Sequence, residues 1–268
     1  MSNKSSIFWR LLFRRLQLHG LRTRYFLMAM LYTATITAGL FVLPPKTQAA
    51  NFTMQTGYYM GTGSAGLAIT GLGFQPDFVM IKSSTAAGAA VFKTSAMPAN
   101  TIAFMSATAD NVATNITLNT DGFSVGTLVN VNSANVLYYW IAIGGSDCSA
   151  TGNFCVGTYT GNGVSPRTIV TGFQPSMTIV KRSTAVDANF RVASQPLNET
   201  LFMDNSARDV AGNYLRDFPA TGFSVGATNN VNTGTYYYAA FGTTAGSFIQ
   251  GTYAGNNTDN RSLAGLGM

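Results

Sequence analysis

The feature that most constrains the fold is an internal repeat with a period of about 100 residues. Residues 73–76 (Gly-Phe-Gln-Pro) recur at 172–175, and residues 122–126 (Gly-Phe-Ser-Val-Gly) recur unchanged at 222–226. A repeat of this length is the commonest size of a whole domain and is too long for a solenoid unit. The sequence therefore predicts the same domain twice in tandem.

Domain boundaries follow from where each copy begins. A Gly-x-Tyr-x-Gly opening stands at residues 57–61 and 157–161, and it returns at 251–255. The final stretch, 250–268, is too short to bury a core of its own. We interpret it as the truncated start of a third copy, with a closing strand of the second copy as the alternative. The two copies are assigned to residues 55–147 and 156–249.

Each copy consists of short apolar or aromatic runs separated by turn residues. Residues 78–82 (Phe-Val-Met-Ile-Lys) and 177–181 (Met-Thr-Ile-Val-Lys) are typical of buried strands. Beyond the first 50 residues no stretch keeps a helical period for three turns, although we expect a short helical turn at 107–113. The pattern predicts an all-β protein: two tandem antiparallel β-sandwich or jelly-roll domains after an N-terminal helical signal segment.

The first 49 residues are predicted to be a signal peptide. Seven of the 16 Lys and Arg residues lie within residues 1–50, which contain no acid, and residues 26–43 carry no charge. Small residues follow at positions 47 and 49, where a signal peptidase would cut after Ala49. An uncleaved signal anchor is the alternative, because the apolar run approaches membrane-spanning length. We therefore expect an exported protein, extracellular or at the cell surface, with the periplasm as an alternative.

The charge balance narrows the function classes. Beyond residue 50 nine basic residues face ten acidic ones, so we expect no nucleic-acid partner. The only histidine, His19, lies in the leader, so the exported part lacks the usual general base and nucleophile partner. We therefore predict no catalytic residues, and membrane contact only through the leader if it is uncleaved.

The two cysteines lie close together in the sequence. Cys148 and Cys155 enclose a six-residue, Gly-containing loop. Since the chain is expected in an oxidising compartment, we predict a local disulfide between them, with two free thiols as the alternative.

The tyrosine-rich strands are the best candidates for ligand binding. Successive residues of a strand point to opposite faces, so one face of 138–140 and 236–238 should lie in the core. We expect Tyr139 and Tyr237 on the other face, where they could stack on sugar rings or on an adjacent subunit. Asn162 and Asn256, in the Gly-rich openings, are the further candidate ligand-binding residues.

Calcium is the one cofactor with any support, and we otherwise expect none. Asp121 and Asp204 stand in oxygen-rich loops of the kind that bind Ca²⁺. The alternative is that these loops contain Asp and Asn because β-turns favour them.

The order of these motifs resembles a known domain type. The second copy opens with Tyr-Thr-Gly-Asn-Gly, where the first has Tyr-Met-Gly-Thr-Gly. Both copies continue with Gly-Phe-Gln-Pro, a short apolar strand ending in Lys, Gly-Phe-Ser-Val-Gly and a Tyr/Trp strand. This series is similar to a concanavalin-like β-sandwich domain found in phage tail-fibre-like proteins and in exported bacterial surface proteins. The resemblance implies a structural or recognition role outside the cell and supplies no catalytic residues.

Three functions remain open. The first is an exported, non-enzymatic repeat protein with a structural, adhesive or fibre-like role at the cell surface, with neighbouring copies of itself as partners. The second is a lectin-like module that binds glycans. The third is a secreted hydrolase.

Overall fold

The computed structural model describes residues 52–84, 88–204, 208–243 and 248–264. All of them belong to one compact unit, Ala49–Met268, which has its own hydrophobic cores. The expected signal peptide, residues 1–49, lies outside the described residues. Within those ranges no helix is long and apolar enough to cross a membrane.

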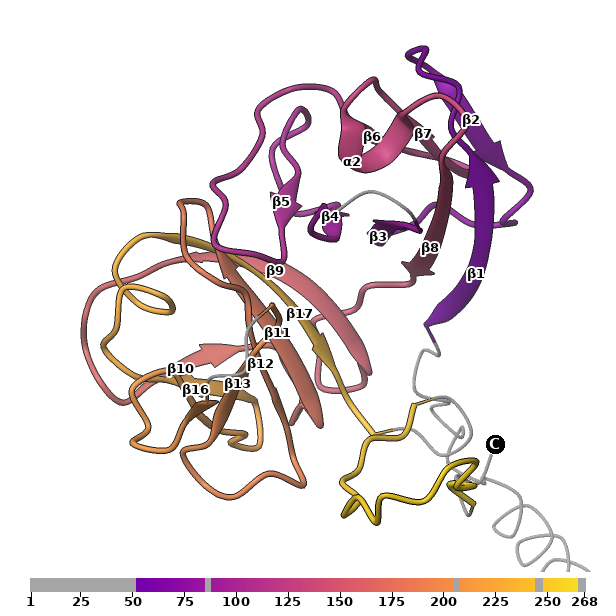
Figure 1. Ribbon diagram of the computed structural model, residues 1–268. Coiled ribbons are helices and arrows are strands. Elements are labelled where there is room, and N and C mark those ends of the chain that lie inside the picture. The colour runs from indigo at the N-terminus through magenta and orange to yellow at the C-terminus, as the bar shows by residue number, and fades with distance from the viewer. Residues whose placement is uncertain (1–51, 85–87, 205–207, 244–247, 265–268) are drawn as a thin grey trace, which may run out of the picture. The chain divides into compact units, whose positions relative to one another are not determined.

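The first copy is built almost entirely of strands (Figure 1). A single short helix, α2 (Val129–Asn132), is the only helix within the described part of the chain. The strands of this copy are β1 (Thr53–Met60), β2 (Leu67–Thr70), β3 (Phe78–Ser83), β4 (Val91–Thr94), β5 (Ala103–Phe104), β6 (Ile116–Asn119), β7 (Gly122–Val125) and β8 (Leu137–Gly144).

The second copy repeats this series with one additional short strand, β14. Its strands are β9 (Phe154–Thr160), β10 (Arg167–Val170), β11 (Met177–Arg182), β12 (Asn189–Val192), β13 (Thr200–Phe202), β14 (Arg208–Asp209), β15 (Leu215–Asp217), β16 (Gly222–Val225) and β17 (Thr235–Phe241).

Each copy has a larger and a smaller antiparallel sheet. The first copy has the orders β1-β8-β3-β4-β5 and β2-β7-β6, and the second has β14-β13-β12-β11-β17-β9 and β10-β16-β15. The prediction of an all-β, antiparallel fold is confirmed. The prediction of a helical turn at 107–113 is wrong, because Asn111 in this segment forms an isolated β-bridge to Ile102. The corresponding segment of the second copy is β14, which pairs with β13.

The opening strand of each copy pairs with the last strand of that same copy. β1 lies beside β8 at the edge of its sheet (Figure 1), and β9 pairs with β17 in the same register. The repeated opening glycine is explained by this pairing. A Cβ on Gly57 would lie 2.6 Å from the ring of Trp140, and one on Gly157 would lie 2.4 Å from the hydroxyl of Tyr238.

Residues 250–264, within the stretch expected to begin a third copy or to close the second, contain no strand. Most of their side chains are exposed, and residues 265–268 lie outside the described part. Because β9 already pairs with β17 on that edge, the second copy has its full set of strands without them.

The inner faces of the two sheets form one core in each copy. The shared Gly-Phe-Ser-Val-Gly motif supplies Phe123 and Val125 to the first core and Phe223 and Val225 to the second, all of them buried. Alternation along the strand explains why Phe and Val are the apolar positions of this motif, since they share one face.

A third core joins the two copies. It contains Phe78, Phe92 and Met105 of the first copy together with Phe154 and Tyr237 of the second. These residues lie on the outer faces of the two larger sheets, which therefore pack against each other. Backbone hydrogen bonds cross the same boundary, from Ala188 N to Met105 O (3.1 Å) and from Asp110 N to Ser183 O (3.0 Å).

Candidate functional site

The tyrosines repeated at the start of the last strand are scaffold residues. The buried Tyr138 hydroxyl donates to Val129 O (2.6 Å) and accepts from Ser133 N (2.7 Å). Tyr236 makes the equivalent pair of bonds, to Asn229 O and from Thr233 N. Each hydroxyl is buried and both donates and accepts a backbone hydrogen bond, so it serves the scaffold and is not accessible to a ligand.

A buried asparagine holds the opening loop of each copy. The Asn132 side chain accepts from Thr62 N (2.7 Å) and donates to Ser64 O and Gly126 O. Asn232 accepts from the backbone N–H of Asn162 and donates to two carbonyls in the same way. The sequence analysis missed both residues. The signal was the Asn-Val-Asn tripeptide at 130–132, which recurs 100 residues later.

A buried cation has a matching role in β4 and in β12. Lys93 Nζ donates to Pro98 O and Ala99 O, and Arg191 Nη1 donates to Pro196 O and the carbonyl of Glu199. Both side chains are buried, and their charges are satisfied by backbone carbonyls of the following loop. Each cation therefore holds the loop that follows its strand against the sheet.

The outer face of β1 and β8 carries exposed apolar side chains, which we call the tyrosine face. It consists of Met54, Tyr58 and Met60 on β1, Tyr139 on β8, and Lys82 beside Tyr139 on β3. Tyr58 is 71% exposed and Tyr139 is 53% exposed, with their ring centroids 6.5 Å apart at 63°. The expectation that Tyr139 is exposed is confirmed.

Tyr139 also borders a small hollow on this face. The hollow, about 120 Å³, is lined by Met80, Lys82, Tyr139, Trp140 and Ile141. Lys82 turns its Nζ to Ser83 O (2.8 Å). The tyrosine face therefore combines aromatic rings, thioether chains and one cation.

Tyr237 does not share this exposure, and the expectation that it lies on the surface is wrong. It is the counterpart of Tyr139, paired with Lys181 as Tyr139 is paired with Lys82. Yet Tyr237 is only 4% exposed, because the first copy covers it. The carboxylate of Asp110, a first-copy residue, interacts with the Tyr237 hydroxyl and, after burial itself, raises the pKa of Tyr237. Binding of a sugar at Tyr237 would require the two copies to separate.

A polar cluster surrounds Tyr237 at the boundary. Burial raises the pKa of Asp110 to about 6, although the Tyr237 hydroxyl and the charge of Lys181 both act to lower it. Burial lowers the pKa of Lys181 to about 8 against the attraction of Asp110, Asp187 and Asp204. Lys181 Nζ donates to Arg182 O and Thr184 O. These opposite shifts identify a desolvated acid and a desolvated base at the junction of the copies.

The two asparagine candidates lie in exposed loops, and among the described residues no hydrogen bond joins them to the tyrosine candidates. The Asn162 side chain accepts from Val164 N (3.0 Å), and the Asn256 side chain accepts from Thr258 N (3.1 Å). Both side-chain oxygens therefore stabilise their own turns. Their role in ligand binding stays a prediction.

The calcium candidates are not brought together. Asp121 uses both carboxylate oxygens to accept from Gly71 N and Gly73 N, which ties β7 to the loop after β2. Asp204 is exposed in the second copy. Among the residues that the structure describes, no three His, Cys, Asp or Glu side chains are grouped to hold a metal. Calcium binding stays a prediction.

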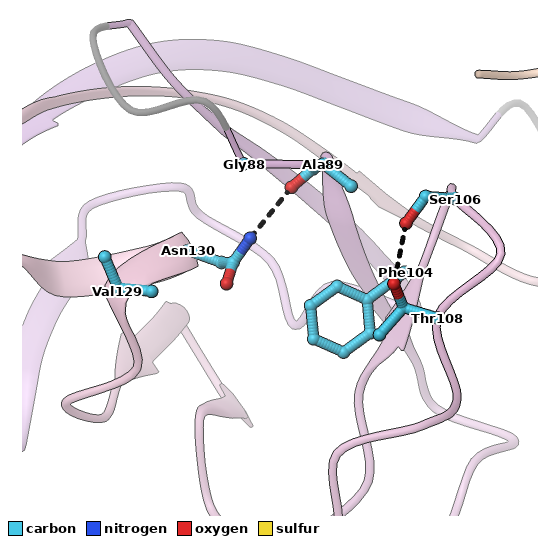
Figure 2. A pocket seen from close by; sticks show the side chains of 7 residues that line it. All are labelled: Gly88, Ala89, Phe104, Ser106, Thr108, Val129 and Asn130. Atoms are coloured by element: carbon cyan, nitrogen blue, oxygen red, sulfur yellow. Dashed lines mark hydrogen bonds between the residues drawn. The ribbon is translucent and has the colours of Figure 1, made fainter. Parts of the chain in front are cut away.

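A larger cleft lies beside α2 (Figure 2). It holds about 700 Å³ and is open on one side, and Asn130 Nδ2 crosses one wall to Ala89 O (3.1 Å). Its lining is apolar, hydroxyl and amide, without a charged side chain. The lining residues are Gly88, Ala89, Phe104, Ser106, Thr108, Val129 and Asn130.

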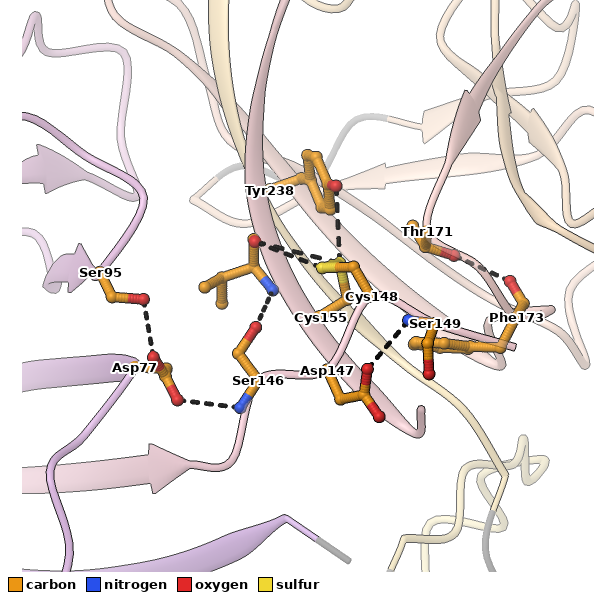
Figure 3. The surroundings of a disulfide bond; sticks show 11 residues. Asp77, Ser95, Ser146, Asp147, Cys148, Ser149, Cys155, Thr171, Phe173 and Tyr238 are labelled. Carbon is orange, nitrogen blue, oxygen red and sulfur yellow. Dashed lines mark hydrogen bonds between the residues drawn. A yellow bond between two sulfur atoms is a disulfide. The ribbon is translucent and has the colours of Figure 1, made fainter. Parts of the chain in front are cut away.

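The linker between the copies forms hydrogen bonds with both of them (Figure 3). Asp77 accepts from Gly145 N and Ser146 N, and Ser146 Oγ accepts from Val156 N in β9. The predicted disulfide is confirmed between Cys148 and Cys155, with Cα atoms 5.0 Å apart. The linker is thus a structured connection whose contacts begin in one copy and end in the other.

The family comparison covers this whole unit. A family model described as a domain of unknown function (DUF7483) matches residues 49–264, and the chain therefore belongs to this family. The single match spans both copies, in agreement with the core that they share. No curated protein and no solved structure matches the chain.

Proposed function

We propose that the chain is an exported, non-enzymatic structural or adhesive protein whose binding surface is the tyrosine face. The observation that carries the proposal is the exposure of Met54, Tyr58, Met60 and Tyr139 on one face of one sheet. Contiguous exposed apolar side chains of this size mark interaction sites in soluble proteins.

The internal repeat supports a protein partner for this face. In the second copy the equivalent face lies against protein, since Tyr237 and Phe154 pack into the core shared with the first copy. The same sheet surface is therefore already used once for domain packing within the chain.

Glycan binding is the alternative, favoured by the Tyr58–Tyr139 ring pair. An edge-on pair of exposed rings on a sheet can present apolar faces to a sugar ring. The uncharged cleft beside α2 would suit a neutral polyhydroxylated ligand, because its polar groups are hydroxyls and an amide.

Adhesion by the exported unit tests the proposal. Beads coated with residues 49–268 should attach to cells that produce the protein or to the surfaces those cells colonise. The double variant Tyr58→Ser/Tyr139→Ser should lose attachment, whereas Tyr253→Ser, which removes another exposed tyrosine, should retain it. Specific binding on a glycan array, lost in the double variant, would favour the glycan alternative.

Localisation supplies the second arm of the test. An epitope placed after Met268 should be accessible to antibody on intact producing cells. Retention of the epitope inside the cell, or turnover of polysaccharide or ester substrates by residues 49–268, would overturn the proposal.

A further inference from the structure

Each larger sheet ends in a long edge strand, β1 in the first copy and β9 in the second (Figure 1). β1 has eight residues and β9 has seven, whereas the other edge strands of the described sheets have four or fewer. A long edge strand presents a row of backbone N–H and C=O groups. Such a row can pair with a strand of another chain unless something covers it.

The register shows which backbone groups of these strands face outward. In an antiparallel pair, alternate residues turn both backbone groups away from the partner strand. Gly61 N donates to Val136 O, in line with β8, so the odd-numbered residues of β1 face β8. Gly161 N donates to Gly234 O, so β9 follows the same rule. The outward-facing residues of β1 are therefore Met54, Thr56, Tyr58 and Met60.

The linker covers the first half of the β9 edge. Asp147 N donates to Phe154 O (2.7 Å), and Val156 N donates to Ser146 Oγ (3.0 Å). Both β9 residues are even-numbered and buried. The linker therefore occupies the place that a further strand would take.

A charged side chain covers the other end of the β9 edge. Arg167 Nη1 in β10 donates to Thr160 O (2.6 Å). The first copy has Leu67 at the equivalent position, because Leu67 pairs with Val125 as Arg167 pairs with Val225. A leucine side chain has no donor, so it cannot cover the β1 edge in this way.

The outward edge of β1 is open by comparison. Among the residues that the structure describes, no hydrogen bond joins the outward backbone groups of β1 to a partner. β1 contains no charged residue and no proline, and it pairs with β8 without a bulge. Charges, prolines and bulges are the usual means by which proteins keep an edge from pairing, and β1 has none of them.

We propose that two copies of this chain associate through β1, which pairs antiparallel with β1 of the second copy about a two-fold axis at Gly57. The outward-facing residues are all even-numbered, and this axis gives each of them a partner within the strand. Met54 then pairs with Met60 of the second copy, and Thr56 pairs with Tyr58 of the second copy. The two larger sheets become one continuous antiparallel sheet.

The partner is a second copy because β1 is its own complement in this register. The strand is uncharged, so self-pairing opposes no like charges. The even-numbered side chains share the outer face of the sheet, which places methionine opposite methionine and Thr56 opposite Tyr58. Pairs of β-branched and aromatic side chains of this kind stabilise antiparallel strands. The inference concerns the edge of the sheet and does not depend on the proposed adhesive role.

Sedimentation velocity of residues 49–268 over a range of concentrations tests the pairing. The parent protein should sediment as a dimer, because a two-fold contact between identical surfaces closes. Thr56→Pro should sediment as a monomer at the same concentrations. Proline there removes an outward N–H and leaves the bonds to β8 in place, since Thr56 faces away from that strand.

Thr158→Pro is the matched control. Thr158 faces outward from β9 and is exposed, so this variant should remain a dimer. If Thr56→Pro lowers the midpoint of urea unfolding, Thr56→Asp gives the same test without a change in the backbone. The added charges oppose each other across the two-fold axis and should abolish the dimer, whereas Thr158→Asp should retain it.

Cysteine cross-linking tests the register. After mild oxidation, a mixture of Thr56→Cys and Tyr58→Cys should form a covalent mixed dimer. Efficient covalent homodimers of either single variant would place the axis at that residue and contradict an axis at Gly57.

Three results in sedimentation would overturn the inference. They are a monomer of the parent protein at every concentration, a dimer that persists in both Thr56 variants, and a series of larger multimers in place of a closed dimer. If the parent protein is a monomer and its beads still attach, the proposed function stands and only the pairing through β1 fails.

Discussion

Tyr139 and Tyr237 hold the same position in the two copies, yet one is 53% exposed and the other is 4% exposed. Each is paired with a lysine on the neighbouring strand, Lys82 or Lys181, in the same register. The difference arises because Asp110 and the first-copy residues of the shared core cover Tyr237, while no described part of the chain covers Tyr139 to the same degree.

This contrast predicts unequal costs for the same truncation. Tyr237→Ala removes a buried ring from the core that joins the copies and should lower the free energy of unfolding by about 3 kcal/mol or more. Tyr139→Ala should change it by about 0.5 kcal/mol or less, as expected for a surface substitution. Urea denaturation of residues 49–268 followed by circular dichroism measures both. Equal losses would mean that Tyr237 is not covered.

The buried asparagines should be essential to their loops. Asn132→Ala leaves the amide of Thr62 and two carbonyls without their partner, and Asn232→Ala does the same in the second copy. Each substitution should cost about 1–3 kcal/mol, because buried polar groups lose their hydrogen bonds. Asn256→Ala is the matched control, since its side chain is exposed, and it should be nearly neutral. If Asn132→Ala left the free energy of unfolding unchanged, the role of Asn132 in holding the opening loop would be contradicted.

Loss of the disulfide should have a moderate effect on stability. Cys148 and Cys155 are seven positions apart in the sequence, and closing so short a loop removes only limited entropy from the unfolded chain. Replacing both by Ser should cost about 2–3 kcal/mol. Comparison with Ser149→Ala, in the same loop, separates the covalent link from local packing. A loss of all folded structure would mean that the linker contributes more than loop closure.

Asp110 predicts a pH dependence of stability. Its pKa in the folded chain is raised from 3.8 to about 6 by burial, so the folded state binds this proton more tightly than the unfolded state does. The stabilisation is therefore present below about pH 4 and is lost as the pH rises through about 6. Asp110→Asn should flatten this part of the stability curve, measured by urea denaturation between pH 4 and 7. An unchanged slope would show that the carboxyl is hydrated.

The sheets could be predicted from the sequence because their signals are local. Period-two alternation, turn residues and the repeated Gly-Phe-Ser-Val-Gly motif all act within one copy, and Phe123 and Phe223 lie where that pattern places them. The disulfide followed from the short spacing of Cys148 and Cys155. The helical turn expected at 107–113 failed because pairing of Asn111 with Ile102 outweighs local preference.

Only part of the candidate binding surface could be predicted from the sequence. Alternation indicates which face of a strand leaves its own sandwich, and it selected Tyr139 and Tyr237 correctly as one set. It carries no information on what covers that face afterwards. The covering depends on the contact between copies, which involves Asp110 and Met105, and neither residue belongs to a repeated motif that marks an interface.

The central claim is that the two copies form one unit through a specific contact, and a double-mutant cycle on Asp110 and Tyr237 tests it most directly. Unfolding free energies are measured for Asp110→Asn, Tyr237→Phe and the double variant of residues 49–268. Because the two side chains interact across the boundary, we predict a coupling energy of about 1 kcal/mol or more. Strict additivity of the two substitutions would contradict the contact and with it the shared unit.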